Sequence, residues 1–478
     1  MIKTGYFYLL NELATNIQKK MKTLIFVFLL VSFGLLFSSY RYLIPIFKPV
    51  TKPVSEVVHP EWSWNSVIYE VNIRQYSPEG TFAAFEKDLP RLKELGVDVI
   101  WIMPVHPIGI KNRKEPLGSY YSVRDYLGVN SKFGTMDDFK SMVNKMHELG
   151  MKAILDWIPN HSSWDNDLII TNPEYYKTDT SGNMVSPFDW TDVVQFEYRN
   201  PELRKYMLNV MKWWLKETDI DGFRCDVAHM VPVDFWNIAR IELDKVKKVF
   251  MIAESEQPFL HEKSFDVTYD WKFHHLMNDI AQGKKNANNI EKHFAWVDSI
   301  YPADSYLMQF TSNHDENSWA GTEYERMGAG AKTFAVLAAT VPGIMMMYNG
   351  QEAGFNRRLK FFEKDSITWE KNEMFGFYQK LISLRKTNNA LFNGAMGGNM
   401  VRISTGKDTS VYAFYREANH EKVFVVLNLS TRNQSLKLKG NAYQGIYKEL
   451  FSGNEEIFKA NSRMVLKPWE YRVYFINE

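Results

Sequence analysis

The chain of 478 residues contains a single cysteine, Cys225, so it can form neither an intrachain disulfide nor a cysteine-based metal cluster. It also carries almost no net charge, because 57 lysines and arginines face 56 aspartates and glutamates. Long basic stretches and nucleic-acid-binding motifs are both missing, and we therefore expect no nucleic-acid partner. The glycine fingerprint GxGxxG of dinucleotide-binding sheets is missing as well.

What the sequence does contain is a globular composition, 45% hydrophobic and 24% charged, with enough length for two or three domains. Aromatic residues are frequent, at 15%. They can fill hydrophobic cores, and they can stack on the flat faces of sugar rings, because both uses need a large apolar surface. Composition alone does not separate these two uses.

The N-terminal part differs from the rest of the chain. Three lysines at positions 19 to 22 precede an unbroken apolar run from Leu24 to Val31. Such a run suits the core of a signal peptide better than a full membrane span, but no clean small-x-small cleavage site follows, so an uncleaved anchor remains an alternative. We predict a signal peptide or membrane anchor over 1–47 and a linker over 48–61. We therefore expect export, to a periplasmic, extracellular or membrane-anchored location, with membrane contact only through this N-terminal segment.

From residue 62 onwards the chain repeats a unit of helix followed by apolar strand. Helical patterns lie at 83–96, 137–150, 201–218 and 233–247. Eight strand candidates lie at 67–73, 97–103, 152–157, 220–225, 249–254, 265–268, 306–312 and 343–348. Such repetition predicts an α/β fold with a parallel sheet covered by helices, and eight units fit a closed (β/α)8 TIM barrel over 62–390. An open doubly wound sheet has the same periodicity and remains the alternative.

Two segments depart from this repetition. The polar stretch 158–200 is too long for an ordinary loop, so it predicts a short inserted domain after the third strand. After residue 390 the helical patterns stop, and short alternating segments separated by turns follow. Residues 391–478 are therefore predicted to form a C-terminal antiparallel β-sandwich domain.

Polar residues fall at the carboxyl ends of the predicted strands, on the face where barrel enzymes carry out their chemistry. They are Asp156, Asn160 and His161 after the third strand, Arg224, Asp226 and His229 at the fourth, Glu254 at the fifth, and Asn313, His314 and Asp315 at the seventh. Each of them alone has a plain structural explanation, such as a helix cap or a surface ion pair. Four carboxylates, three histidines and an arginine at one mouth are harder to explain in this way.

The segment DGFRCDVAH at 221–229 places Arg224 and Asp226 two residues apart, at the carboxyl end of the fourth predicted strand. Two is the strand period, so both side chains leave the same face and each favours the charged form of the other. A simple ion pair and a pre-ionised nucleophile both fit this spacing. Cys225 lies between them, and its side chain should point the opposite way, into hydrophobic packing.

Three acids at one mouth suit the cleavage of a glycosidic bond. This reaction needs one carboxyl group to protonate the leaving oxygen and a carboxylate to attack the anomeric carbon or to activate a water. Burial and two neighbouring anions would raise the pKa of Glu254 and keep it protonated, while Arg224 would keep Asp226 ionised. The residues therefore predict an acid from Glu254 and an attacking oxygen from Asp226.

Four segments in this order, DWIPNH, GFRCDVAH, the glutamate after MIA, and TSNHD, resemble the signature segments of the α-amylase superfamily of retaining glycoside hydrolases. The resemblance covers residues 62–478. It implies that Asp226 is the nucleophile, that Glu254 is the general acid/base and that Asp315 stabilises the transition state.

The resemblance also implies which residues bind the substrate. They are Tyr121 (from GSYYSVRDY), Asp156, His161, Arg224, His229 and His314. Asn160 matches a position that often binds calcium, so a calcium ion is the cofactor that the resemblance suggests. One departure affects specificity: where the family often has Lys-His after the nucleophile, this chain has His229 and Met230.

The predicted function is a retaining hydrolase that cleaves α-1,4-glucosidic bonds of starch, glycogen or maltodextrin by double displacement, with an α-glucan as its partner. An α-glucan transglycosylase, acting as a glucanotransferase or branching enzyme, would use the same three acids. A membrane-anchored family member without catalytic activity and a carbohydrate-binding surface protein are further alternatives. The presence of all three acids argues against both.

Overall fold

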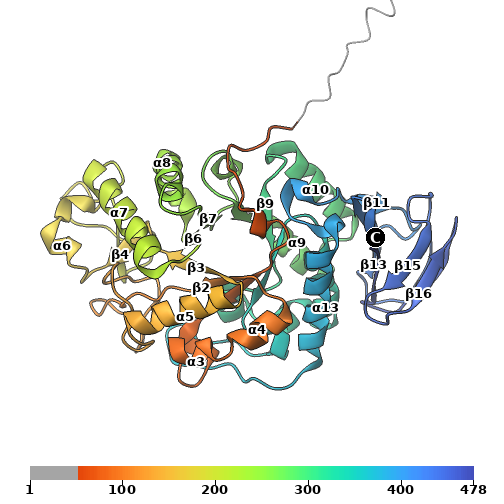
Figure 1. The fold of residues 1–478 in the computed structure, drawn as a ribbon, viewed down its shortest axis with the longest axis horizontal. Coiled ribbons are helices and arrows are strands. Elements are labelled where there is room, and N and C mark those ends of the chain that lie inside the picture. Colours follow the sequence, from red (N-terminus) through yellow and green to blue (C-terminus); the bar gives the residue numbers. More distant parts are fainter. Residues whose placement is uncertain (1–51, 478) are drawn as a thin grey trace, which may run out of the picture. The chain divides into compact units, whose positions relative to one another are not determined.

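The computed structural model describes residues 52–477, and the chain from Pro53 onwards forms one compact unit (Figure 1). The predicted signal peptide or anchor over 1–47 lies outside the described residues. Among the helices between residues 52 and 477, none combines the length and the hydrophobicity that a membrane crossing requires.

Eight parallel strands close into a barrel, as the sequence predicts. They are β1 (Ile68–Val71), β2 (Val99–Ile102), β3 (Lys152–Trp157), β6 (Gly222–Cys225), β7 (Phe250–Ala253), β8 (Val267–Tyr269), β9 (Tyr306–Gln309) and β10 (Ile344–Tyr348). Around the barrel each strand pairs with the next of these eight, and β10 pairs with β1 to close the ring. Each strand coincides with or overlaps a predicted segment. The closed ring excludes the open sheet.

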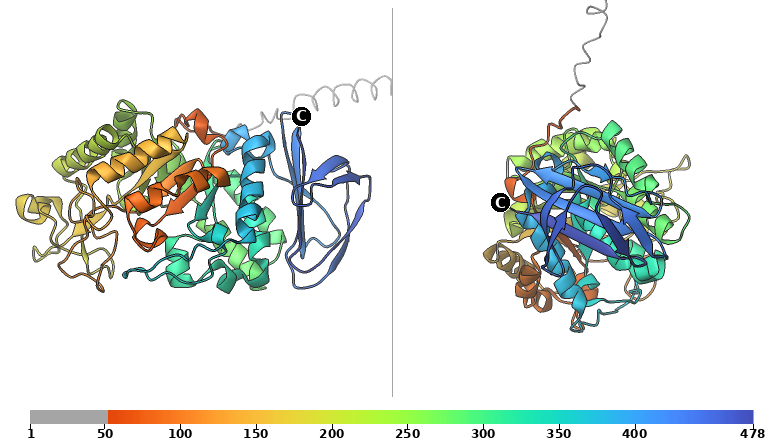
Figure 2. Two further views of the ribbon diagram at one scale, coloured as in Figure 1. Left: turned by 60° about the horizontal axis from the view of Figure 1, so that its bottom comes forward. Right: turned by 90° about the vertical axis from the view of Figure 1, so that its right-hand side faces the viewer.

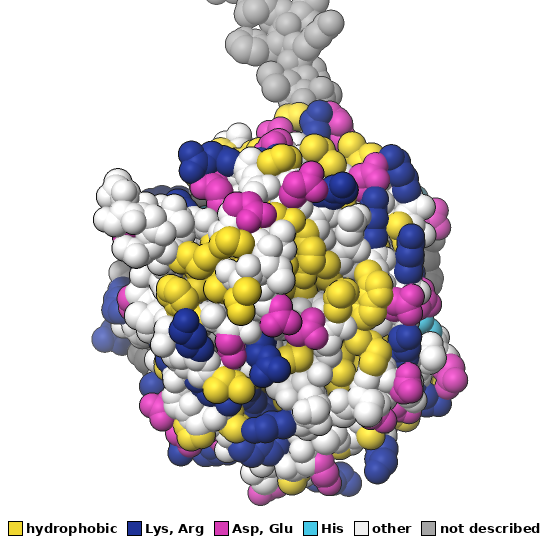
Figure 3. All heavy atoms as spheres, turned by 90° about the vertical axis from the view of Figure 1, so that its left-hand side faces the viewer, with side chains coloured by type: hydrophobic (Ala, Val, Ile, Leu, Met, Phe, Trp, Pro, Cys, Tyr) yellow, Lys and Arg dark blue, Asp and Glu magenta, His cyan; other side chains and the backbone are white. Residues whose placement is uncertain are grey.

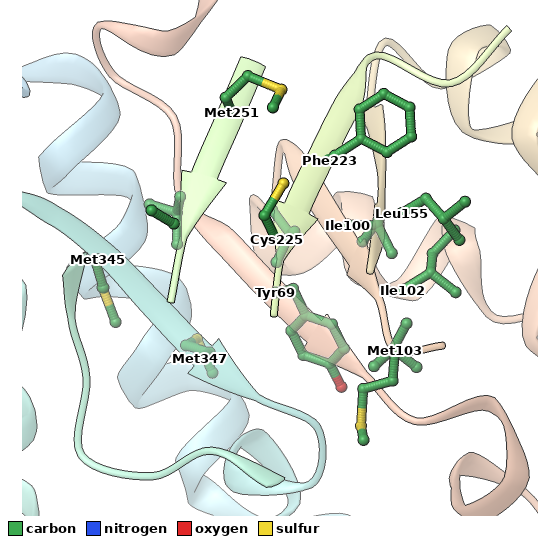
Figure 4. Packing of buried hydrophobic residues seen from close by; sticks show 14 of the residues in the cluster. Tyr69, Ile100, Ile102, Met103, Leu155, Phe223, Cys225, Met251, Met345 and Met347 are labelled. Atoms are coloured by element: carbon green, nitrogen blue, oxygen red, sulfur yellow. The ribbon is translucent and has the colours of Figure 1, made fainter. Parts of the chain in front are cut away.

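Side chains along the barrel strands point alternately outwards and inwards. They form one hydrophobic core between barrel and helices and a second core inside the barrel. On β6, Phe223 and Cys225 point outwards into the hydrophobic layer between barrel and helices, next to Met251 of β7 (Figure 4). Arg224 lies between them and points to the inside of the barrel, where its neighbours include Trp101 and Tyr269. The prediction that Cys225 packs away from the polar residues is thus confirmed.

Helices surround the barrel (Figure 1). They are α2 (Ile73–Tyr76), α3 (Phe82–Glu86), α4 (Leu89–Leu95), α5 (Met136–Glu148), α7 (Pro201–Thr218), α8 (Val233–Asp244), α9 (Trp271–Ala281), α10 (Asn288–Ile300), α11 (Glu323–Met327), α12 (Ala331–Thr340) and α13 (Glu373–Thr387). The single helix predicted over 83–96 is wrong, because the structure has two helices there. Pro90 lacks an amide hydrogen and fits only a first helical turn, so α4 begins anew at Leu89.

Gly222 allows β6 to lie close to β7. A Cβ atom at this position would stand 1.9 Å from the carbonyl oxygen of Phe250, which is far inside van der Waals contact. The glycine of the Asp-Gly-Phe sequence therefore has a steric role, since it lets the strand that carries Arg224 enter the barrel.

The stretch predicted as an inserted domain forms a small irregular subdomain. It contains the two-stranded antiparallel sheet of β4 (His161–Ser163) and β5 (Val193–Gln195) and the short helix α6 (Leu168–Thr171). On the side of the molecule that carries α6 in Figure 1, lysines and arginines alternate with acidic side chains and hydrophobic groups (Figure 3). This mixture agrees with a net charge close to zero.

The C-terminal part is an antiparallel β domain. Its main sheet consists of β11 (Val401–Ile403), β12 (Val411–Ala418), β13 (Glu421–Asn428), β18 (Tyr471–Ile476), β15 (Gly445–Glu449) and β16 (Glu455–Phe458), and a ribbon consists of β14 (Gln434–Lys437) and β17 (Arg463–Leu466). One face of β13, with Val423 and Val425, joins the core of the barrel helices, whereas Phe424 packs with Leu436 and Leu466 of the ribbon. Helix α13 lies between barrel and sheet (Figure 2).

The predicted linker is bound to the barrel over its described part. Ser55 donates to Asp304, the backbone N–H of Glu56 donates to the carbonyl of Glu262, and His59 lies 2.8 Å from Asp266. Asp266 and Asp304 precede β8 and β9, so this segment covers the amino-terminal end of the barrel. The sequence pattern missed these contacts because their partners lie more than two hundred residues away.

Candidate active site

The polar residues that the sequence places at strand ends meet at the carboxyl end of the barrel. Asp226 follows β6, Glu254 follows β7, and His314 and Asp315 follow β9. Parallel strands end at the same rim, so side chains from distant parts of the sequence converge there.

Arg224 is the centre of the buried charge network. Its side chain has no exposed surface, its Nη1 lies 2.9 Å from Asp156 and 3.1 Å from Asp226, and its Nη2 lies 3.0 Å from Glu254. The predicted pairing of Arg224 with Asp226 is therefore present. The sequence did not show that the same guanidinium also contacts Glu254, because that contact depends on how β6 and β7 pair.

The backbone at Val227 is strained in a way that serves the site. This residue has φ of 37° and ψ of 47°, a left-handed conformation that β-branched side chains rarely adopt. In this conformation its N–H donates a 2.8 Å hydrogen bond to Oε2 of Glu254. The turn after the strand thus orients the carboxylate of Glu254.

Asp226 and Glu254 titrate as a pair. Burial and the adjacent Glu254 carboxylate raise the pKa of Asp226 well above its ordinary value, and the two side chains share a hydrogen bond. Burial also disfavours the charge on Glu254, but Arg224 and the N–H of Val227 outweigh it and lower the pKa of Glu254. A proton is therefore held more tightly by Asp226 than by Glu254. This corrects the predicted order of the two pKa values, because Arg224 contacts both carboxylates.

His314 is held as a cation. Its Nδ1 lies 2.5 Å from Oε1 of the buried Glu70, and its Nε2 lies 2.8 Å from the hydroxyl of Tyr121. Burial works against the charge, but Asp315 and Glu70 raise the pKa of His314 to about 9. Glu70 was not among the site residues predicted from the sequence. Its signal was an acidic residue in the apolar first strand, at a position that faces the inside of the barrel.

Asp156 supports the arginine from below. Its two oxygens accept hydrogen bonds from Arg224, from Nε1 of Trp101 and from the hydroxyl of Tyr121, the latter two at 3.1 Å. Burial raises the pKa of Asp156 to about 6 although Arg224 opposes this change. Asp156 and Arg224, predicted as substrate-binding residues, have no exposed surface and do not line the cavity described below, so they orient the groups above them instead.

A cavity of 420 Å³ opens directly above these groups. Six of the predicted residues line it: Tyr121, His161, Asp226, Glu254, His314 and Asp315. A cavity of this size admits a small ligand. Two carboxyl groups that share a proton, beside a third carboxylate and an imidazolium, can protonate a leaving oxygen and can attack an electrophilic carbon.

Comparison with known proteins agrees with this geometry. The model of the alpha amylase catalytic domain matches residues 65–374, which is more than half of the chain. The chain belongs to the alpha-amylase family. A second model, the alpha-amylase SusG C-terminal domain, matches residues 411–473.

Several characterised members resemble this alpha-amylase-family glycoside hydrolase over most of its length. The noncanonic maltogenic alpha-amylase AmyB from Thermotoga neapolitana is 33% identical with a TM-score of 0.79, and the match covers 86% of this chain and 98% of that one. Alpha-amylase 2 from Dictyoglomus thermophilum is 25% identical, over 83% of this chain and 74% of its own length. A cyclomaltodextrinase from Thermoanaerobacter pseudethanolicus is 26% identical, over 85% and 78%.

The two remaining predicted histidines, His161 and His229, differ in their position relative to the cavity. His161 lines the cavity, and burial lowers its pKa to about 4, so it is neutral at physiological pH. His229 lies on the short turn Ala228–Met230, where its side chain is exposed and does not line the cavity. The structure thus brings His161 to the reacting centre but not His229.

The calcium ion that the resemblance suggests finds a poor ligand set in this enzyme. Asn160 is buried, and its amide nitrogen lies 3.3 Å from Nδ1 of His161. Calcium binds through six to eight oxygen atoms, usually with several carboxylates. Within residues 52–477, no group of three or more His, Cys, Asp or Glu side chains is placed to hold a metal ion. The residues around Asn160 therefore do not fit such a site.

Proposed function

We propose that this enzyme is a retaining hydrolase of α-1,4-glucosidic bonds in starch and maltodextrins. In this proposal Asp226 is the nucleophile, Glu254 is the general acid/base and Asp315 stabilises the transition state. The observation that carries the proposal is the direct contact between Asp226 and Glu254, which share a hydrogen bond and the cation of Arg224.

The closeness of the two carboxyl groups supports retention of configuration. Inverting enzymes separate their two carboxyls by roughly 6.5–9.5 Å so that a water molecule fits between them, whereas retaining enzymes need only about 5–5.5 Å. Asp226 and Glu254 lie within hydrogen-bonding reach of each other, which leaves no room for that water. The carboxylate can then attack the sugar directly.

The reaction proceeds in two displacements. In the first, Glu254 donates its proton to the glycosidic oxygen while a carboxylate oxygen of Asp226 forms a bond to the anomeric carbon and the bond to the leaving sugar breaks. In the second, Glu254 removes a proton from water, whose oxygen bonds to the anomeric carbon as the bond to Asp226 breaks. The first step requires the shared proton to move from Asp226 to Glu254 when the substrate replaces water around the pair.

The neighbouring groups stabilise the positive charge that develops on the sugar ring. The Asp315 side chain is 39% exposed at the cavity, so its carboxylate can approach the ring, and it lies 3.4 Å from Nε2 of His314. His314 and the neutral His161 line the cavity and can bind sugar hydroxyls. Asp156 and Arg224, which have no exposed surface, hold these groups in place.

The substrate is inferred from the relatives as well as from the site. Relatives named maltogenic alpha-amylase and cyclomaltodextrinase support maltodextrins joined by α-1,4 bonds. A transglycosylase would use the same residues, and it differs only in whether water or a sugar resolves the covalent intermediate. The test must therefore show whether water or a sugar accepts the glycosyl group.

The experiment is a time course with maltoheptaose in which products are separated by length and the anomeric configuration is followed by NMR. The proposal expects shorter α-maltodextrins as the dominant products, and no cleavage by Asp226→Asn, whose activity should fall by at least about 10³-fold. Products longer than the substrate as the main species would show a transglycosylase. First-formed β-anomers would overturn the retaining mechanism.

We also propose that the enzyme is exported, which the lysines at 19–22 and the apolar run after them support. Fractionation of cells that express the full chain tests this, with the amount of enzyme in the medium, the periplasm, the membrane and the cytoplasm as readout. Recovery in the cytoplasm alone would contradict the proposal.

A further inference from the structure

We propose that Trp319, together with Phe361 and Phe362, forms a binding platform for the glucose units that lie beyond the cleaved sugar, on the side away from Glu254. This inference rests on the proposed function. It assigns a recognition site to three aromatic residues that line the catalytic cavity but take no part in the chemistry.

The platform continues an aromatic series that begins at the reacting centre. The ring of Tyr121 stacks near His314 at 5.5 Å, and Phe361 lies nearly parallel to Tyr121, at 11° and 6.4 Å between centroids. Trp319 follows at 5.3 Å from Phe361, and Phe362 lies 5.8 Å from Trp319. The series leads from the buried histidine outwards to the surface.

Trp319 is 56% exposed at the outer end of this series. A tryptophan side chain is usually largely buried, because exposing its rings to water leaves a large apolar area without contact. At the mouth of a cavity such a ring offers a flat apolar surface, which matches the apolar face of a glucose ring. The alternative role, filling a core, does not fit a ring that is more than half exposed.

The backbone holds the platform rigidly. Trp319 lies on a π-helical turn, Glu316–Ala320, which begins directly after Asp315, and such turns are frequent at functional sites. The side chain of the buried Asn317 on this turn accepts from the N–H of Leu359 at 2.8 Å and donates to the carbonyl of Arg357 at 3.3 Å. Asn317 thus ties the turn of Trp319 to the loop that carries the two phenylalanines.

A second set of contacts fixes that loop to the barrel. The side chain of the buried Gln75 donates to the carbonyl of Lys360 at 2.6 Å, and the N–H of Leu117 donates to the carbonyl of Phe362 at 3.2 Å. Rings that are held in place before binding lose little conformational entropy when a sugar stacks on them. The platform is therefore preorganised.

The barrel order decides on which side of the cleaved bond the platform lies. The loop of Phe361 follows β10, which lies directly across the eight-stranded ring from β6, the strand before Asp226, and Trp319 follows β9, which β8 separates from β7. The leaving sugar must lie next to Glu254, which protonates its oxygen. The loop of Phe361 and Phe362 thus follows the strand farthest from that of the nucleophile, three strands from that of Glu254, and we therefore place the platform against the part of the glucan that stays attached to the cleaved sugar.

Binding to a catalytically inactive enzyme tests the platform without depending on turnover. Titration calorimetry of Asp226→Asn with maltotriose and maltoheptaose is repeated in the double variant Asp226→Asn/Trp319→Ala. We expect the Kd for maltoheptaose to rise about tenfold on loss of Trp319, and Trp319→Phe in the same background to retain most of the affinity. Phe259→Ala, which removes an exposed ring outside the cavity, is the matched control and should leave the Kd unchanged.

Kinetic measurements on the enzyme that keeps all three catalytic acids then test on which side of the cleaved bond the platform lies. The substrates p-nitrophenyl α-glucoside, α-maltoside and α-maltotrioside share one leaving group and differ only in the sugars that the platform would hold. We expect Trp319→Ala to leave kcat/KM for the glucoside within twofold and to lower it about tenfold for the maltotrioside. An equal loss for all three overturns the placement. An unchanged maltoheptaose Kd, or no binding of maltodextrin at all, overturns the platform.

The two proposals fail in distinguishable ways. If the wild type cleaves no α-glucan while the inactive variant binds maltoheptaose through Trp319, the hydrolase assignment fails and the platform stands. If cleavage occurs but neither affinity nor chain-length dependence responds to Trp319, the platform fails and the hydrolase assignment stands.

Discussion

Nδ1 of His314 lies 2.5 Å from Oε1 of Glu70, and both side chains are almost completely buried beneath the catalytic cavity. The pair connects the loop after β9, which carries His314, to strand β1, which carries Glu70. Because Glu70 is fully buried and does not line the cavity, its role is to keep His314 protonated and correctly oriented, which makes it a positioning residue.

We expect Glu70→Gln to move the alkaline limit of activity to lower pH. Asp315 and Glu70 raise the pKa of His314 from 6.5 to about 9 in spite of burial, and removing one of these charges lowers it. The alkaline limb of kcat/KM should shift down by about one pH unit or more, with little change near pH 5.5. Glu352→Gln removes another buried carboxylate, outside the cavity, and should leave the pH profile in place.

The same pair makes stability depend on pH. A histidine whose pKa is raised by folding contributes stability that is fully present below pH 6.5 and is lost as the pH rises through about 9. The unfolding temperature should therefore fall between pH 7 and pH 9.5, and less so in Glu70→Gln. An equal fall in both proteins would contradict this account of His314.

Replacing Arg224 by methionine should destabilise the fold strongly. The substitution leaves the buried carboxyls of Asp156, Asp226 and Glu254 without their shared cation, and removing one partner of a buried ion pair costs about 3–5 kcal/mol. Denaturant unfolding measures the loss. Adding Asp156→Asn should recover part of the stability, because the second change removes one uncompensated charge. If the two changes add without coupling, the network does not act as described.

Gly222→Ala tests the close approach of two strands. The new Cβ would stand 1.9 Å from the carbonyl oxygen of Phe250, so β6 and β7 must separate, at a cost of about 1–3 kcal/mol or more. The matched control is Gly376→Ala in helix α13, where a Cβ meets nothing within 4 Å. That change should stabilise the protein by about 0.5–1 kcal/mol, because alanine is the better helix former. Similar effects at both positions would refute the steric role of Gly222.

Two histidines that the sequence presents alike should behave differently. His161→Ala removes a buried imidazole from the cavity, and we expect kcat/KM to fall by about tenfold or more through the loss of a buried hydrogen bond to the sugar. His229→Ala changes an exposed side chain outside the cavity, and activity should stay within twofold. The comparison uses kcat/KM for maltoheptaose with circular dichroism as a check of folding. A large loss in His229→Ala would show that the substrate reaches further than the cavity.

Chelation tests the ligand set around Asn160. Since the amide of Asn160 lies against His161 and not among carboxylates, we expect EDTA to leave both activity and unfolding temperature unchanged. A loss that calcium restores and magnesium does not would show a calcium site that these residues do not reveal.

Much of the fold could be predicted because it depends on local sequence patterns. The alternation of apolar strands with helices places all eight barrel strands, and a polar residue after a strand end places Asp226, Glu254 and Asp315 at one mouth. The helix break at Pro90 was also readable from the chemistry of proline, although the helical spacing around it concealed the break. Such features depend on neighbours within a few residues, so the sequence carries them directly.

The sequence by itself determined the barrel, its inserted and C-terminal parts, and the types of side chain at the catalytic rim. Only the tertiary structure decided that Glu70 holds His314, that Arg224 contacts both Asp226 and Glu254, and that His229 stays outside the cavity. The physical reason is that these contacts join strands and loops far apart in the chain. Their distances depend on barrel closure and strand register, whereas hydrophobic periodicity records only which face of its own element each side chain occupies.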